Sequence, residues 1–264
     1  MFQGMNFRKF NQFFSTEDKC HKYLYEIKWK KGYCCRRCAH DKFWRGRTKY
    51  HARCRKCNYD ESVTANTVFH KIQISLRKAF SITFHLTVLK KGLSSRNLAD
   101  IVDVDPKTVL FFTHKIRKAM GDWVFTNTKK ASSGKFYCVD AVVLTNRSEN
   151  LNGLQRLNIV MKKTRSSAKL KFIHCKGLVP DENLIDPCHL VAGKYVGEGK
   201  SIPVWNFKSW LTGVHHHCSN KNHQNYLDEF SFKFCLRNSK STIWHTLIKW
   251  MMVMKPFEIK LHAA

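Results

Sequence analysis

The chain has 264 residues, and 47 Lys and Arg residues against 19 Asp and Glu residues give it a formal net charge of +28. A charge this large favours a polyanionic partner, with nucleic acid considered first and an anionic membrane surface second. Hydrophobic residues at 43% and aromatic residues at 13% can form packed cores, which excludes a disordered basic tail. No apolar run approaches the roughly 18 residues of a membrane span, and residues 1–14 lack a signal-peptide core. We therefore expect no membrane span, and a location at the nucleoid of a prokaryotic cytoplasm or in a eukaryotic nucleus. Because most of the excess charge lies in residues 1–130, with the predicted binding modules described below, we expect DNA and no membrane as the partner.

Four of the eleven cysteines form two tight pairs, Cys35/Cys38 and Cys54/Cys57, separated by 15 residues. A two-residue gap lets both thiolates of a turn face one tetrahedral ion, and two such turns complete a four-thiolate zinc site. The odd number of cysteines and this pairing favour a metal site over a disulfide framework. The pattern predicts a zinc ribbon with structural Zn²⁺ and short strands at 42–44 and 49–51. Cys34 is an alternative ligand to Cys35, although the spacing favours Cys35, and four unrelated buried cysteines are the other alternative.

The ribbon region is strongly basic, since residues 28–56 contain twelve Lys and Arg residues against a single acid, Asp41. Aromatic residues are interleaved with these charges at positions 29, 33, 43, 44 and 50. Basic side chains in such a pattern can contact phosphates, and aromatic ones can contact grooves or bases. The alternative is a basic face that is merely solvated. The DNA-binding candidates in this region are Arg36, Arg37, Arg45, Arg47, Arg53, Arg55 and Lys56.

A helical region is predicted after the ribbon. Apolar residues at near-helical spacing predict a helix over 75–90, ended by Lys90, Lys91 and Gly92. A short helix over 94–102, a turn at 103–105 and a longer helix over 106–120 then resemble a helix-turn-helix, whose second helix reads a major groove. This interpretation makes Lys115 and Lys118 DNA-binding candidates. Simple core packing of two helices is the alternative.

The pattern changes after a polar, turn-rich boundary at 129–134. Segments 135–144, 154–162 and 169–175 are rich in β-branched or aromatic residues and are predicted strands. Asp140 lies in the middle of the first one, and an acid in an apolar strand is costly to bury unless it is paired, hydrogen-bonded or metal-bound. It is thus a candidate ligand for a divalent metal, the alternative being a strand-edge carboxylate in water. Apolar residues between 226 and 251 are expected to pack over the sheet.

The order of these parts resembles the DDE-type insertion-sequence transposases with an N-terminal zinc ribbon, the group that includes the Merlin elements. The resemblance extends over most of the chain in family order. It rests on the two cysteine pairs, on Val139-Asp140, and on residues 62–70 (SVTANTVFH), 76–80 (LRKAF), 90–94 (KKGLS), 114–120 (HKIRKAM), 206–219 (NFKSWLTGVHHHCS) and 226–234 (YLDEFSFKF).

This resemblance implies two-metal phosphoryl transfer on an RNase H-like sheet. Carboxylates would hold two Mg²⁺ or Mn²⁺ ions during in-line attack on a DNA phosphodiester. Asp140 matches the first family acid and Asp186 is the candidate for the second, while Lys208 would contact DNA phosphate. The interval between residues 140 and 213 is much shorter than relatives need, so we expect a catalytic domain shortened by internal loss.

Together these inferences predict an α+β multidomain protein. Its parts are a helical lead-in (1–27), a zinc ribbon (28–70), a helical, helix-turn-helix-like DNA-binding region (71–128) and a shortened RNase H-like α/β transposase domain (135–264). The predicted function is that of a transposase that binds element-end DNA and performs metal-dependent strand cleavage and transfer. The alternative is a catalytically inactive DNA-binding protein derived from one. The expected partners are double-stranded DNA, as terminal inverted repeats and target, and further copies of the chain on that DNA.

Overall fold

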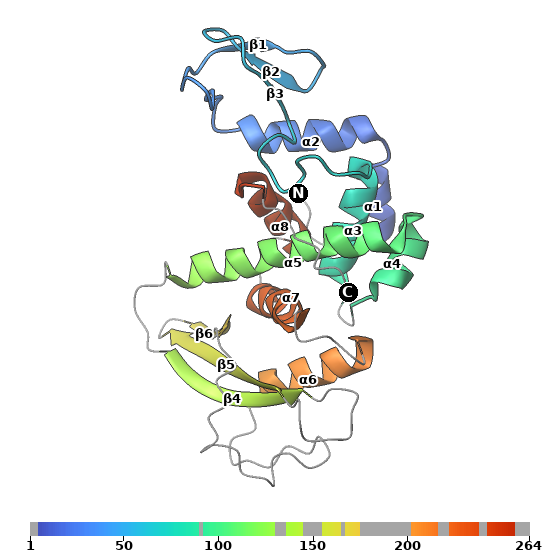
Figure 1. Cartoon of the computed structure of the whole chain (residues 1–264), viewed down its shortest axis with the longest axis vertical. Coiled ribbons are helices and arrows are strands. Elements are labelled where there is room, and N and C mark those ends of the chain that lie inside the picture. The colour runs from blue at the N-terminus through green and yellow to red at the C-terminus, as the bar shows by residue number, and fades with distance from the viewer. Residues whose placement is uncertain are drawn as a thin grey trace. The chain divides into compact units, whose positions relative to one another are not determined.

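The computed structural model describes residues 5–89, 92–129, 136–144, 155–164, 167–174, 202–215, 222–237 and 242–256. The chain divides into two compact units, whose helices and strands are labelled in Figure 1. The first comprises Met1–Ala119 together with Ser239–Ala264, and the second comprises Met120–Asn238. None of the described helices combines the length and apolar character of a membrane span.

The first unit begins with two short helices, α1 (Phe7–Phe13) and α2 (Glu17–Trp29). Each is preceded by a residue whose side-chain oxygen accepts a backbone N–H of the first turn: Asn6 caps α1 and Thr16 caps α2. Glu17 and Asp18 in the first turn of α2 also interact favourably with the positive end of the helix dipole.

A small sheet follows, built from β1 (Phe43–Arg45), β2 (His51–Cys54) and β3 (Asp60–Ser62), antiparallel and in chain order. The strand predicted at 42–44 is confirmed as β1. The second strand begins at His51, later than predicted, because a turn closed by a hydrogen bond from the His51 N–H to the Thr48 carbonyl (3.1 Å) occupies the preceding residues.

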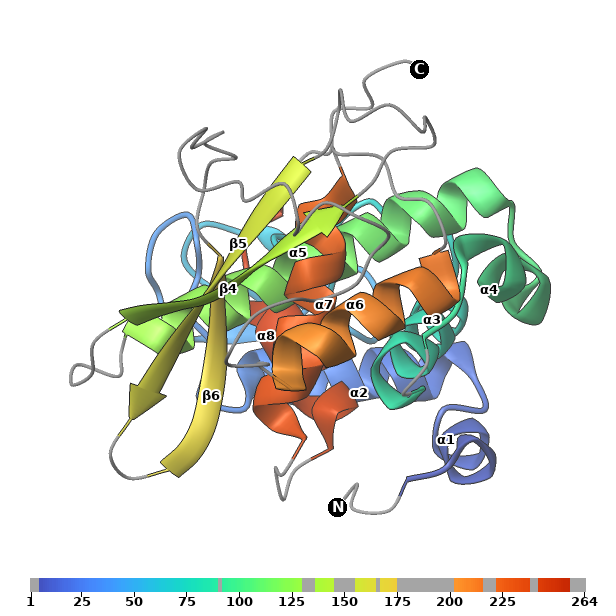
Figure 2. The same cartoon turned by 90° about the horizontal axis from the view of Figure 1, so that it is seen from below.

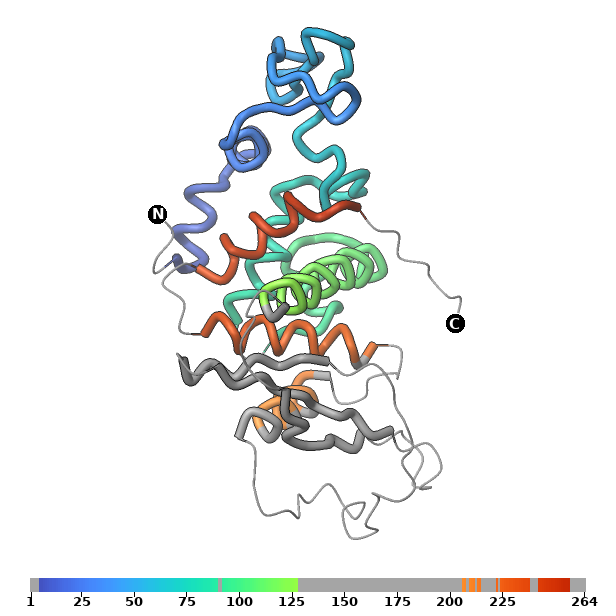
Figure 3. The backbone as a smooth tube through the Cα atoms, turned by 90° about the vertical axis from the view of Figure 1, so that its left-hand side faces the viewer, coloured from blue at the N-terminus to red at the C-terminus, as the bar shows by residue number. Residues whose placement is uncertain are grey.

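The helical core of the first unit brings together segments from the two ends of the chain. Helix α8 (Ile243–Val253) packs against α2 and α3 (Leu76–Val88), as Figure 3 traces in red beside the blue and teal tubes. Its Trp244, only 1% exposed, contacts the rings of Phe10, Phe14, Tyr23 and Phe80. The sequence analysis predicted that apolar residues 247–251 pack over the sheet formed by segments 135–144, 154–162 and 169–175. In the structure, the helix that contains them packs against α2 and α3 instead.

The N-terminus of α3 is capped by a carboxylate from α2. Glu17 accepts hydrogen bonds from the backbone N–H groups of Leu76 (2.6 Å) and Arg77 (3.0 Å). Glu17→Gln removes the charge and weakens this cap, so we expect the free energy of unfolding to fall by about 1 kcal/mol. Urea unfolding followed by circular dichroism measures the change. Glu26→Gln, an exposed acid on the same helix, is the control, and an equal loss in both variants would contradict the capping role.

A second stability prediction concerns pH. The Tyr23 hydroxyl is hydrogen-bonded to Nδ1 of His245, linking α2 to α8, and burial together with Lys249 lowers the pKa of His245 to about 4. Because an unfolded histidine titrates near pH 6.5, the unfolded chain binds the extra proton first, so stability falls as the pH drops from about 6.5 to 4. We expect His245→Gln to reduce this loss in thermal unfolding measured across that range. The parent and the His245→Gln variant carry the same cysteine cluster, so any effect of pH on that cluster is common to both. Equal pH profiles of the two proteins would therefore overturn the assignment to His245.

Helices α4 (Ser95–Val102) and α5 (Pro106–Lys129) form the predicted pair joined by a short turn. Asp103 ends α4 in the left-handed conformation with a φ of 52°, and the Asp105 carboxylate accepts the N–H of Thr108 at 3.1 Å to begin α5. Helix α5 continues to Lys129, beyond Met120 where the sequence pattern placed its end, and so runs from the first unit into the second.

The second unit contains an antiparallel sheet of β4 (Phe136–Leu144), β5 (Gln155–Thr164) and β6 (Ser167–His174), which confirms the three predicted strands. Helix α7 (His223–Leu236) lies along β6, and α6 (Ile202–His215) lies beside β4 and α7 (Figure 2). Within this unit Gly121 of α5 lets the chain approach α7 closely, because a Cβ there would lie 2.4 Å from the Asp228 carboxylate.

Candidate zinc centre and basic surface

The structure gathers the four paired cysteines into one cluster. The sulfur atoms of Cys35, Cys38, Cys54 and Cys57 all lie within 4.8 Å of one another. The Cys35–Cys57 and Cys38–Cys54 sulfur separations are 3.6 and 3.5 Å. Tetrahedral Zn²⁺ with bonds of about 2.3 Å requires sulfur atoms about 3.8 Å apart. The donor set and its spacing therefore fit a structural zinc ion.

Both cysteine turns are built in the same way. In each, the second cysteine is followed by a residue in the left-handed conformation, Ala39 (φ 57°) and Asn58 (φ 56°). The N–H of that residue donates to the carbonyl of the first cysteine, at 2.8 Å to Cys35 and 3.1 Å to Cys54. Cys34 lies outside this arrangement, exposed, with its thiol directed to the Ala39 carbonyl. The geometry therefore favours Cys35 over Cys34 as a ligand.

The electrostatics of the cluster also favour a cation. Burial alone would raise the pKa of the Cys35 thiol, but backbone N–H groups of Cys38 and Arg37 and the neighbouring sulfurs lower it to about 6. A backbone N–H from His40 acts in the same direction on Cys38, yet burial and the surrounding sulfurs raise its pKa to about 12. Four thiolates this close repel one another, so a divalent ion is needed to stabilise all of them together.

Most of the ribbon aromatics that were predicted to contact nucleic acid pack against other residues of the protein. Tyr33 is buried beside the cysteines, with Trp29 and Phe43 packed against the same cluster. Tyr50 stacks on His21. Trp44 differs, since 55% of it is exposed. The alternation of side chains along β1 explains why Phe43 is packed and Trp44 is exposed, because Phe43 faces the cysteines and Trp44 faces away from them.

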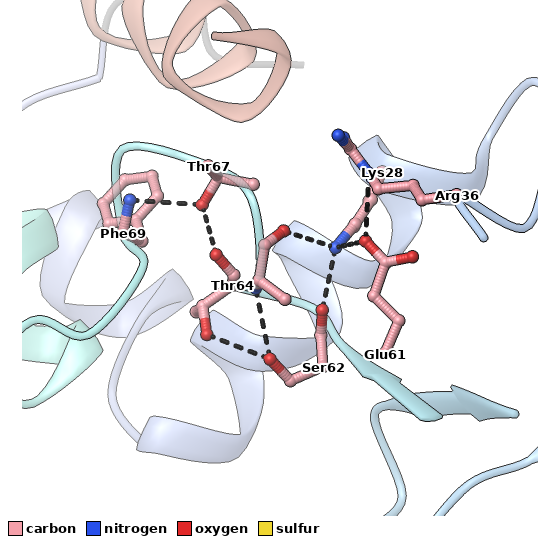
Figure 4. Close-up of polar contacts among 8 residues, drawn as sticks. Lys28, Arg36, Glu61, Ser62, Thr64, Thr67 and Phe69 are labelled. Atoms are coloured by element: carbon pink, nitrogen blue, oxygen red, sulfur yellow. Dashed lines mark hydrogen bonds and ion pairs between the residues drawn. The ribbon is translucent and has the colours of Figure 1, made fainter. Parts of the chain in front are cut away.

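A buried ion pair joins α2 to the ribbon, and the sequence analysis did not identify it (Figure 4). Lys28 contacts Glu61 at 2.8 Å, with side chains 7% and 1% exposed, and Arg36 lies 3.3 Å from the same oxygen. The Lys28 ammonium also donates to the carbonyls of Ser62 (2.8 Å) and Ala65 (2.9 Å). Burial lowers the pKa of Lys28, and the Glu61 carboxylate opposes that shift. The available signal was a pair of adjacent acids, Asp60 and Glu61, a few residues after the basic stretch of 28–56.

Residues 62–70, one of the segments on which the family resemblance rests, form a hydrogen-bonded turn that leaves the ribbon. The Ala65 N–H donates to the Ser62 hydroxyl, and the Thr67 hydroxyl donates to the Thr64 carbonyl and accepts the Phe69 N–H (Figure 4). The Val68 N–H donates to the Met251 carbonyl of α8 at 3.0 Å. The segment thus connects the ribbon to the helical core.

The predicted DNA-binding side chains are mostly exposed. This holds for Lys118 on α5, whereas Lys115 is half-buried. Arg36 is exposed but is paired with Glu61. The remaining exposed candidates are Arg37, Arg45, Arg47, Arg53, Arg55 and Lys56.

The predicted catalytic residues are covered only in part. Asp140 lies in β4 and Lys208 in α6, but their side chains are outside the described residues. Asp186 lies wholly outside them. In the part of the chain that the structure describes, the cysteine cluster is the one group of metal-ligating side chains brought together.

Comparison with known proteins gives one family match. Residues 15–60, from just before α2 to the start of β3, match the family described as the transposase zinc-ribbon domain. No curated protein and no solved structure matches the chain. The chain therefore carries a transposase-type zinc ribbon near its N-terminus, which supports a relationship to insertion-sequence transposases.

Proposed function

We propose that the chain is a DDE-type transposase, of the group that includes the Merlin elements, which binds element-end DNA and then cleaves and transfers its strands. The match of residues 15–60 to a transposase zinc ribbon carries this proposal, together with the four thiols that form its cluster. The net charge of +28 suits a polyanionic partner. The proposal includes the boundaries at 28–70, 71–128 and 135–264 and a location at the nucleoid or in the nucleus.

DNA binding is assigned to the ribbon and the helical region. The exposed arginines of the ribbon would neutralise phosphates, so the affinity would fall steeply with salt. Helix α5, with Lys115 and Lys118 on it, would lie in a major groove next to α4 as in other helix-turn-helix proteins. Copies of the chain assembled on two element ends would bring those ends together.

Catalysis is assigned to the RNase H-like region, with Asp140 and Asp186 as ligands of Mg²⁺ or Mn²⁺. When bound, such ions activate the attacking hydroxyl and stabilise the leaving oxygen. One backbone feature supports Asp140: the pairing of β4 with β5 shifts register between Cys138 and Asp140. Such a shift marks a β-bulge or a similar irregularity of the strand, and β-bulges are frequent beside active sites.

The test is a supercoiled plasmid that carries candidate terminal inverted repeats, incubated with the zinc-loaded protein and Mg²⁺ or Mn²⁺. We expect metal-dependent nicking that Asp140→Ala abolishes and Asp41→Ala, an exposed ribbon acid, leaves unchanged. Binding of both variants to the same DNA must remain equal. Tight binding without nicking by the parent would instead favour the second candidate, an inactive DNA-binding derivative of a transposase. The short interval between residues 140 and 213 is the feature of the sequence that favours this candidate.

A further inference from the structure

The outer face of β1 and β2 presents an aromatic ring among arginines. In the β1–β2 pairing Trp44 lies opposite Arg53, while the neighbouring pair Phe43 and Cys54 belongs to the core beside the cysteines. Trp44 and Arg53 are both exposed. Cross-strand partners share one face of a sheet, so this ring and this guanidinium point to the same side.

The ring is held in a defined arrangement. The guanidinium of Arg55 lies over the Trp44 ring, 3.9 Å from its centroid, and its Nε donates to the Phe43 carbonyl at 3.3 Å. A cation over an indole face is attractive, and the planar guanidinium stacks there better than an ammonium. Trp44 remains 55% exposed despite this contact. The stack therefore orients the ring and covers one of its two faces, while more than half of the side chain remains accessible.

The turn beside this face is fixed as well. Gly46 follows β1 and lies close to Asp60, since a Cβ on Gly46 would lie 2.1 Å from Oδ1 of Asp60. The other carboxylate oxygen of Asp60, Oδ2, accepts the backbone N–H of Arg47 at 3.1 Å. The Asp60 carboxylate thus binds the turn backbone. In the described part of the chain Arg45, Arg53 and Arg55 form no ion pair within 4.0 Å. Their charges remain available to a polyanion.

We propose that Trp44, Arg53 and Arg55 form a stacking site for an unpaired nucleotide in DNA. An indole face stacks favourably on a base, and this contact needs a base whose own face is free. Bases inside a duplex are stacked on their neighbours and do not offer that face. The arginines beside the ring would hold the adjacent phosphates. This inference rests on the proposed function and assigns the ribbon to gaps or frayed ends of the DNA that the protein handles.

The experiment measures the affinity of the full zinc-loaded chain by fluorescence anisotropy at fixed salt. The probes are a blunt duplex, the same duplex with a short single-stranded DNA gap, and a version with RNA in the gap. We expect the parent to prefer the DNA gap. Trp44→Ala should weaken gapped-DNA binding about tenfold and change blunt-duplex binding less than about twofold. Trp44→Phe should retain most of the affinity, and Arg55→Lys should lose part of it.

Phe13→Ala is the matched control, since Phe13 is an exposed aromatic (49%) in the same unit outside the ribbon, and zinc content reports on folding in every variant. Equal losses on blunt and gapped DNA, no loss in Trp44→Ala, or preference for the RNA gap would each overturn the stacking site. Failure of the parent to bind blunt duplex in a salt-sensitive manner would instead contradict the proposed function. The two failures are therefore distinguishable.

Discussion

Replacing Cys54 by serine is expected to release about one equivalent of zinc from the chain and to unfold the ribbon around it. Cys54 is buried, its sulfur lies 3.5 Å from that of Cys38, and the Lys56 N–H donates to it at 3.4 Å. A serine oxygen is a poor replacement for a thiolate, and three remaining thiols hold Zn²⁺ weakly. Zinc binding contributes on the order of 10 kcal/mol to folding of such units, so this is the largest single effect that we predict.

Metal analysis after gel filtration measures the zinc, and near-ultraviolet circular dichroism follows the aromatic residues packed near the cluster. Cys34→Ser is the matched control, because Cys34 is adjacent in sequence but exposed and outside the cluster; it should retain its zinc. Unchanged metal content in Cys54→Ser would show that the four-cysteine assignment is wrong. Unfolding of the ribbon should also weaken duplex binding, because the proposed function assigns phosphate contacts to the arginines of the ribbon.

The cysteine cluster was predictable from the sequence because its geometry is local. Two-residue gaps within each pair, and a short hairpin between the pairs, determine where the sulfurs lie. Helix starts were similarly accessible, since caps such as Ser94 and Pro106 at the first turn of α5 are adjacent in sequence to the helices they begin. The Zn²⁺ site and the helical pair therefore needed no knowledge of the tertiary structure.

The missed features depend on contacts between distant segments. Trp244 packs on Phe10 and Phe14 from the other end of the chain, and Glu17 caps a helix that begins at Leu76. Neither contact has a local pattern, and the apolar spacing of α8 is equally compatible with packing on a sheet. The burial of ribbon aromatics was missed for a related reason. Alternation along a strand places Phe43 and Trp44 on opposite faces of the small sheet, but the sequence does not say which of the two faces packs against the cysteines.

The buried ion pair between α2 and the ribbon gives the second large prediction. Lys28→Met leaves the Glu61 carboxylate, which is 1% exposed, with the partly exposed Arg36 as its remaining cation within 4.0 Å among the described residues. It also leaves the Ser62 and Ala65 carbonyls without their shared donor. Removing one partner of a buried pair costs about 3–5 kcal/mol, and we expect a loss of this size in urea unfolding of the zinc-loaded chain. Lys30→Met, an exposed charge just beyond α2, is the control and should cost little.

A double-mutant cycle separates the ion pair from simple loss of packing. Glu61→Gln alone leaves the Lys28 ammonium buried without its carboxylate, whereas Lys28→Met combined with Glu61→Gln removes both charges and the cost of burying them. The double variant should therefore be destabilised by clearly less than the sum of the single losses. Additive losses would mean that the two side chains stabilise the junction independently. Because Lys28 also holds the turn at 62–65, a strong coupling would identify this pair as the contact that sets the ribbon on α2.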